Sequence, residues 1–135
     1  MLAQALIVVG AGAMGLLGTV HLLYTFFTDR FEPRDAATMS AMQADHPMLT
    51  RRTTLWHAWV GFNASHSLGV MLFAALYLML AIHHIELLRA SPALVWLAVV
   101  GASGYLLLAQ RFWFRTPLIG IAISTGCFLG AALAL

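Results

Sequence analysis

A long apolar segment opens with the stretch Arg51-Arg52-Thr53-Thr54-Leu55-Trp56-His57-Ala58-Trp59-Val60-Gly61-Phe62-Asn63-Ala64-Ser65-His66-Ser67. At about 100° per residue, several of its side chains share one helical stripe. The members of this stripe are Arg52, Trp56, Trp59, Asn63, His66 and Ser67. If the helix crosses a bilayer, Asn63 and His66 lie roughly 14 and 18 Å along the helix axis from its first turn. Polar groups at that depth need partners and are expected to mark a site of function.

The composition around this stretch indicates a protein built for lipid. Of 135 residues, 61% are hydrophobic and 9% are charged, and the mean hydropathy is +0.87. Soluble domains carry about 25% charged residues. All seven basic residues are Arg, and the net charge of +2 rests on too few groups to indicate nucleic-acid binding. Cys127 is the single cysteine, which excludes an intramolecular disulfide.

Four apolar runs predict four membrane-spanning helices, at about residues 3–28, 54–82, 93–110 and 117–135. Each has close to the length of about 20 residues that a bilayer requires. The predicted fold class is therefore all-α. We expect a single integral membrane domain, residues 1–135, built as a transmembrane four-helix bundle with a short interfacial helix between the first and second spans. That short helix is predicted to begin at Pro33 and run through Gln43. Residues 83–92 and 111–116 are predicted turns.

Glycine patterns occur in the first and fourth spans. Gly10-Ala11-Gly12-Ala13-Met14-Gly15 matches the dinucleotide-binding pattern Gly-x-Gly-x-x-Gly letter for letter. That pattern functions between a strand and a helix of a parallel sheet, whereas here the apolar run continues unbroken. We therefore expect these glycines to let another helix approach closely. Ala122, Gly126 and Gly130 repeat at four-residue spacing and predict a packing face, which favours a homo-oligomer or a subunit of a larger membrane complex.

The arginine distribution predicts the topology. The first and third connections carry six of the seven arginines, and the second carries only Arg89. By the positive-inside rule, loops 29–53 and 111–116 are cytoplasmic and both termini are periplasmic, in a bacterial inner membrane. Aromatic residues gather at the same ends of the spans, as an interfacial belt should. They are Tyr24, Phe26, Phe27, Trp56, Trp59, Phe112, Trp113 and Phe114.

The leading functional hypothesis is a non-enzymatic binding or accessory role toward membrane lipids, a lipophile or a larger membrane complex, with no nucleic-acid partner. The candidate pocket consists of His21, Thr25, Arg52, Trp56, Trp59, Asn63, His66 and Ser67. The alternative is a membrane enzyme or carrier for an amphiphile. In that case Arg52 binds the anionic head group of the amphiphile. Asn63, His66 and His21 then orient or protonate the amphiphile deeper in the pocket. No carboxylate lies within any span, so catalytic residues are not assigned.

A third hypothesis is haem b binding through paired histidines. Neutral imidazole is a good axial ligand, and bundle cores hold such cofactors. The candidate ligands are His21, His57 and His66. His83, His84 and Glu86 also invite a metal site, but adjacent histidines on a helix diverge by about 100°. A solvated loop is the better interpretation there, and no metal site is predicted.

Two resemblances accompany these patterns. The runs 49–69, His21-Leu22-Leu23-Tyr24-Thr25-Phe26 and Phe31-Glu32-Pro33-Arg34 resemble a functionally uncharacterised family of small four-span bacterial membrane proteins, over roughly residues 1–80. In size, layout and its Arg…His…Asn run, the chain is also similar to the membrane-associated eicosanoid and glutathione metabolism proteins. Those are trimers that bind glutathione between subunits. This second resemblance implies binding roles for Arg52 and Asn63, although His66 and Ser67 stand where such proteins carry an acidic residue.

Overall fold

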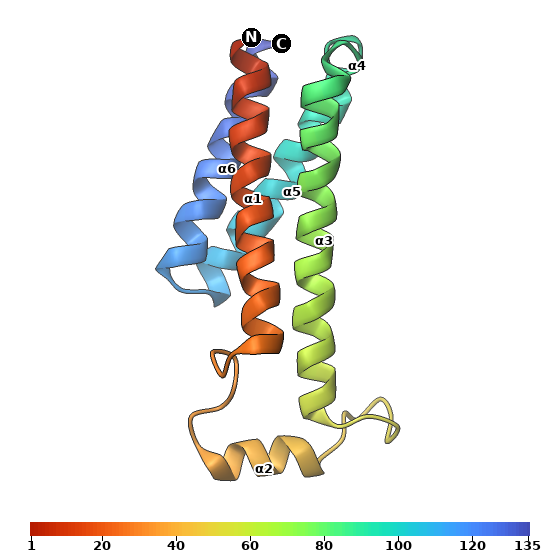
Figure 1. Cartoon of the computed structure of the whole chain (residues 1–135), viewed down its shortest axis with the longest axis vertical. Coiled ribbons are helices and arrows are strands. Elements are labelled where there is room, and N and C mark those ends of the chain that lie inside the picture. The colour runs from red at the N-terminus through yellow and green to blue at the C-terminus, as the bar shows by residue number, and fades with distance from the viewer. The chain divides into compact units, whose positions relative to one another are not determined.

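The computed structural model describes all 135 residues as an all-α chain of six helices (Figure 1). In chain order they are α1 (Leu2–Phe27), α2 (Ala36–Ala44), α3 (Leu55–His83), α4 (Ile85–Ala90), α5 (Pro92–Phe112) and α6 (Arg115–Ala134). The helices α1, α3, α5 and α6 are long and apolar enough to cross a membrane. The predicted fold class is confirmed: there are no strands, and the four long helices can span a membrane as a bundle.

The short helix α2 begins later than predicted. Pro33 lies in the linker, and the first helical residue is Ala36, because Asp35 occupies the N-cap. The Asp35 carboxylate accepts hydrogen bonds from the Thr38 backbone N–H at 3.0 Å and from its hydroxyl at 2.8 Å. Asp is a preferred N-cap because its side chain satisfies a free amide of the first turn. The Thr38 side-chain and backbone hydrogen bonds hold the pKa of the Asp35 carboxyl below its ordinary value.

The two predicted turns, 83–92 and 111–116, are wrong in part. Residues Ile85–Ala90 form α4, where Leu88 is fully buried and Arg89 pairs with Glu86 at 2.6 Å. Good helix formers and an i,i+3 ion pair favour that extra turn and a half. At the other site, α5 continues through Phe112 and α6 already begins at Arg115. The connection there is therefore much shorter than predicted.

The chain divides into two compact units. Residues 1–17 and 70–135 form one, which we call the core unit, and residues 18–69 form the other, which we call the polar unit. Both α1 and α3 contribute to each. In the core unit α1 and α6 are antiparallel neighbours, since Gly130 lies against Leu6 and Gly120 against Leu17, and the two chain ends meet (Figure 1).

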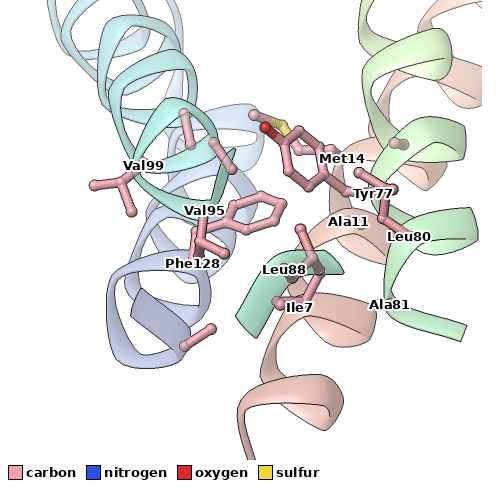
Figure 2. Packing of buried hydrophobic residues seen from close by; sticks show 14 of the residues in the cluster. Ile7, Ala11, Met14, Tyr77, Leu80, Ala81, Leu88, Val95, Val99 and Phe128 are labelled. Carbon is pink, nitrogen blue, oxygen red and sulfur yellow. The ribbon is translucent and has the colours of Figure 1, made fainter. Parts of the chain in front are cut away.

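The core unit packs around Phe128 of α6 (Figure 2). Its ring is fully buried and lies in edge contact with Phe73 and Tyr77 of α3, at centroid distances of 5.7 and 5.5 Å. Further side chains come from α1, α4 and α5. The largest of these that are fully buried are Ile7, Met14, Leu88 and Val95. All five helices of the core unit therefore share one apolar cluster.

Three polar side chains connect these helices to one another. Ser124 Oγ of α6 donates to the Gly10 carbonyl of α1 at 2.7 Å. Gln4 Nε2 of α1 donates to the Ala81 carbonyl of α3 at 2.9 Å, and the Tyr77 hydroxyl donates to the Leu94 carbonyl at 2.7 Å. Such bonds are worth about 0.6–2 kcal/mol each in a bundle. No buried side-chain nitrogen or oxygen lacks a partner.

Two of the α1 glycines, Gly10 and Gly15, serve helix packing, whereas nothing lies within 4 Å of a Cβ atom added to Gly12. A Cβ atom on Gly10 would lie 3.1 Å from both Cys127 Cβ and Ser124 O, and one on Gly15 would lie 3.2 Å from Ala74 Cβ. The segment is helical throughout, so the strand and sheet that a dinucleotide site requires are absent. On α6 the predicted face divides. Gly130 packs on α1, whereas the region around Gly126 is open.

Candidate functional site

The polar unit is centred on a hydrogen bond between α1 and α3. His21 Nε2 lies 2.9 Å from Asn63 Oδ1. The nitrogen of the same Asn63 side-chain amide donates to the Trp59 carbonyl at 2.9 Å. With the nitrogen so used, Asn63 Oδ1 faces the histidine, and because this oxygen only accepts, His21 Nε2 carries the proton. Asn63 is buried, and both ends of its amide are satisfied within the protein.

Two other members of the predicted pocket form hydrogen bonds within their own helices. Ser67 Oγ donates to the Asn63 carbonyl at 2.9 Å, and Thr25 Oγ1 donates to the His21 carbonyl at 2.8 Å. Both are bonds to the carbonyl four residues back, the common way for a hydroxyl to be satisfied inside a helix. Each hydroxyl hydrogen is therefore used within its helix and is not available to a ligand.

Aromatic rings surround the His21 imidazole. Phe31, from the linker after α1, lies at a centroid distance of 4.5 Å, and the His66 ring lies edge-on at 5.3 Å. His66 in turn stacks on Phe62 at 6.2 Å. The histidine pair is thus enclosed by its own unit, half-buried between apolar rings.

The linker is held against α3 by Trp59. Its indole Nε1–H donates to the Phe31 carbonyl at 3.1 Å, between residues 28 positions apart in the chain. Phe31 is a site residue that the stripe on α3 did not predict. The signal available for it was Phe31-Glu32-Pro33, an apolar side chain and a proline within an otherwise polar segment.

A small cavity of about 20 Å³ lies beside Asn63. It has room for about one water molecule. Its lining residues are polar and aromatic and include Glu32. The lining residues are Thr25, Thr28, Phe31, Glu32, Trp56, Trp59, Val60 and Asn63.

A larger, open groove of about 340 Å³ adjoins it, between the linker, α2 and α3. Its lining is mostly apolar: Phe31, Pro33, Met42 and Trp59, with Glu32 as the one charged residue. Phe31, Glu32 and Trp59 thus border both hollows. The groove has the volume of a small-molecule site.

The structure places the predicted pocket residues in three groups. Thr25, Trp56, Trp59 and Asn63 line the small cavity, and Trp59 also lines the groove. His21, His66 and Ser67 lie next to Asn63 through the contacts described above. Arg52 is exposed and borders neither hollow. The arginine expected at the pocket mouth is therefore apart from it.

His21 and His66 are not arranged as a pair of axial haem ligands. His21 Nε2 is a donor to Asn63, and the rings of His21 and His66 touch edge to face, which leaves no space for a porphyrin between them. His57 is exposed and stands outside this group. At the other connection, Glu86 pairs with Arg89, and no cluster of three or more His, Cys, Asp or Glu side chains is arranged to hold a metal.

Comparisons of the chain with protein-family models, with curated proteins and with solved structures found no match. The resemblances drawn from the Leu49–Gly69 run therefore remain predictions. Function has to be argued from the geometry of the polar unit.

Proposed function

We propose that this protein is a small integral membrane protein with a non-enzymatic binding or accessory role, which holds the apolar part of a lipophile in the groove of the polar unit. The observation that carries the proposal is the groove itself, with a volume of about 340 Å³ and a lining of four apolar residues and one charged residue, Glu32. Ligand sites in proteins are commonly concave and apolar, with few polar groups.

The hydrogen bonding favours binding over catalysis. His21 and Asn63, the residues that an acid–base mechanism would use, are bonded to each other and to the backbone. A general acid or base has to reach its substrate proton at about 2.6–3.2 Å or through one water. The cavity beside Asn63 has room for about one water molecule and is too small for a substrate. An enzyme or carrier acting on an amphiphile remains the alternative proposal.

The outer surface of α6 supports association with a partner. Ala122 and Gly126 are exposed, and nothing lies within 4 Å of a Cβ atom added to Gly126. Small residues at such a surface let a second helix approach closely in lipid. We include in the proposal a homo-oligomer, or a subunit of a larger membrane complex, with α6 as the contact helix.

The proposed location is the bacterial inner membrane, with periplasmic termini. Six of the seven arginines lie between α1 and α3 or at the ends of α5 and α6 that meet at the third connection, and arginine-rich ends face the cytoplasm by the positive-inside rule. Alkaline phosphatase fused after Leu135 should therefore be active in cells, because this enzyme folds only in the periplasm. An inactive phosphatase, together with an active cytoplasmic reporter at the same position, would reverse the topology.

The binding role predicts a lipophile in the purified protein. Trp59→Ala removes one wall of the groove, and Trp96→Ala is a matched control, because the two indoles are similarly exposed (41% and 44%) and Trp96 lies on α5. Loss of one aromatic wall costs about 1.5 kcal/mol or more, so the amount bound should fall roughly tenfold. Mass spectrometry of small molecules extracted from detergent-purified protein measures it.

A second variant distinguishes the effect of the groove on binding from the effect of the Trp59–Phe31 hydrogen bond. Met42→Trp narrows the groove with a bulkier side chain and leaves both partners of the Trp59–Phe31 hydrogen bond in place. It should also release the lipophile, with the thermal midpoint unchanged. Equal amounts of lipophile in all four proteins, or none in the unmodified protein, would reject the proposed role.

A further inference from the structure

The loop between α2 and α3 is closed at its base. The Leu55 N–H donates to the Asp45 carbonyl at 3.0 Å, and His46 Nδ1 donates to the Thr53 carbonyl at 2.7 Å. The His46 N–H is in turn bonded to Asp45 Oδ1 at 2.8 Å. These bonds join residues seven and ten positions apart. The loop is therefore a built element whose shape does not depend on burying its tip.

The tip of this loop is apolar. The Thr50 N–H donates to the Pro47 carbonyl at 3.1 Å, which makes Met48 and Leu49 the two central residues of a turn. Central turn positions usually hold Gly, Pro, Asn, Asp or Ser. Here they hold two large apolar side chains with relative exposures of 105% and 93%. Apolar surface left in water forgoes the stabilisation that burial would give, about 25 cal/mol for each Å². The tip gains that stabilisation only if something other than water covers it.

Positive charge follows directly after the tip. Arg51 and Arg52 are exposed, and the one ion pair of the chain is that between Glu86 and Arg89. The Arg52 backbone N–H donates to Thr50 Oγ1 at 3.1 Å, which fixes the main chain here, and no carboxylate forms an ion pair with either guanidinium. Guanidinium groups recognise phosphate through paired hydrogen bonds.

The loop adjoins a membrane span. Leu49 is six residues before Leu55, where the 29-residue apolar helix α3 begins. A chain of six residues reaches at most about 20 Å. The tip is therefore within reach of the bilayer surface that α3 enters, and it combines apolar side chains with phosphate-binding ones.

We propose that the loop from Asp45 to Leu55 is a membrane-inserting finger. Met48 and Leu49 enter the interfacial layer of the bilayer, and Arg51 and Arg52 bind the phosphates of anionic lipids. A bilayer suits this surface better than a protein does. Two side chains form too small a patch for a stable protein interface, which buries about 800 Å² on each partner. The inference uses none of the groove residues, so it is independent of lipophile binding.

The experiment measures the depth of Leu49 directly. In a Cys127→Ala background, Leu49→Cys is labelled with an environment-sensitive fluorophore, and the protein is placed in nanodiscs of phosphatidylcholine with or without phosphatidylglycerol. The control is Gln43→Cys, because Gln43 is an exposed polar residue of α2. We expect lipids with a nitroxide near the headgroup to quench the Leu49 label several times more than the Gln43 label. Aqueous iodide should quench the Gln43 label more.

The arginines are tested in the same assay. Replacing both, as Arg51→Gln with Arg52→Gln, should reduce the quenching of the Leu49 label in phosphatidylglycerol nanodiscs and leave it nearly unchanged in phosphatidylcholine alone. Circular dichroism and the thermal midpoint check that the variants fold. A Leu49 label as open to iodide as the Gln43 label would overturn the proposal. A Leu49 label shielded from both quenchers would overturn it too, since a protein would then cover the tip.

Discussion

Phe128→Ala is expected to lower the free energy of unfolding by about 3–5 kcal/mol, the cost of a large cavity in a packed core. The Phe128 ring has no exposed surface and contacts Phe73 and Tyr77. Removing it leaves those two rings without a partner on one side.

The measurement for Phe128→Ala is denaturation in detergent, followed by circular dichroism. Phe27→Ala is the matched control, since it is the same replacement at a ring that is 78% exposed. The control should unfold close to the unmodified protein. Equal midpoints for the two variants would mean that the core unit does not depend on Phe128.

Gly10→Ala and Gly12→Ala are expected to change stability in opposite directions. A methyl group on Gly10 would lie 3.1 Å from the Ser124 carbonyl oxygen and 3.1 Å from Cys127 Cβ, so α1 and α6 must separate. Overpacking of this kind costs about 1–3 kcal/mol. Nothing lies within 4 Å of the same group on Gly12, where Ala gains up to about 1 kcal/mol through helix propensity.

The pair of glycine variants is measured by the same denaturation, and each serves as the control for the other. The separation of α1 and α6 also strains the hydrogen bond from Ser124 Oγ to the Gly10 carbonyl. Ser124→Ala combined with Gly10→Ala should therefore cost less than the sum of the two single changes. If both glycine variants raise the midpoint, the close approach of α1 and α6 is wrong.

These predictions connect the core unit to the role proposed for the polar unit. The core unit holds the helices together through Phe128, Ser124 and glycine contacts. The polar unit then carries the groove, the histidine pair and the closed loop. Changes at Trp59 or Leu49 should therefore alter binding or membrane contact with little effect on the fold.

The sequence by itself determined the four long helices. Hydropathy and length are properties of consecutive residues, so α1, α3, α5 and α6 were predicted to within a few residues of their observed ends. The periodicity of an α-helix is equally local. It placed Trp59, Asn63 and Ser67 on one stripe of α3, as the structure has them.

Hydropathy alone did not predict where the short helices begin and end. The start of α2 depends on the hydrogen bonds that the Asp35 carboxylate accepts from Thr38, and α4 depends on the burial of Leu88 against the core. Both features have a sequence signal, an aspartate before Ala36 and a run of helix formers at 85–89. A pattern of apolar residues does not report either, because each involves only one or two side chains.

Only the tertiary structure decided which residues meet. Gly126 and Gly130 have the same local pattern, yet the region around Gly126 is open whereas Gly130 packs on Leu6 of α1. Likewise His21 and Asn63 are 42 residues apart, and Phe31 reaches Trp59 only because the linker turns back after α1. Such contacts depend on how distant segments pack, and the spacing of residues along one helix carries no information about its partner.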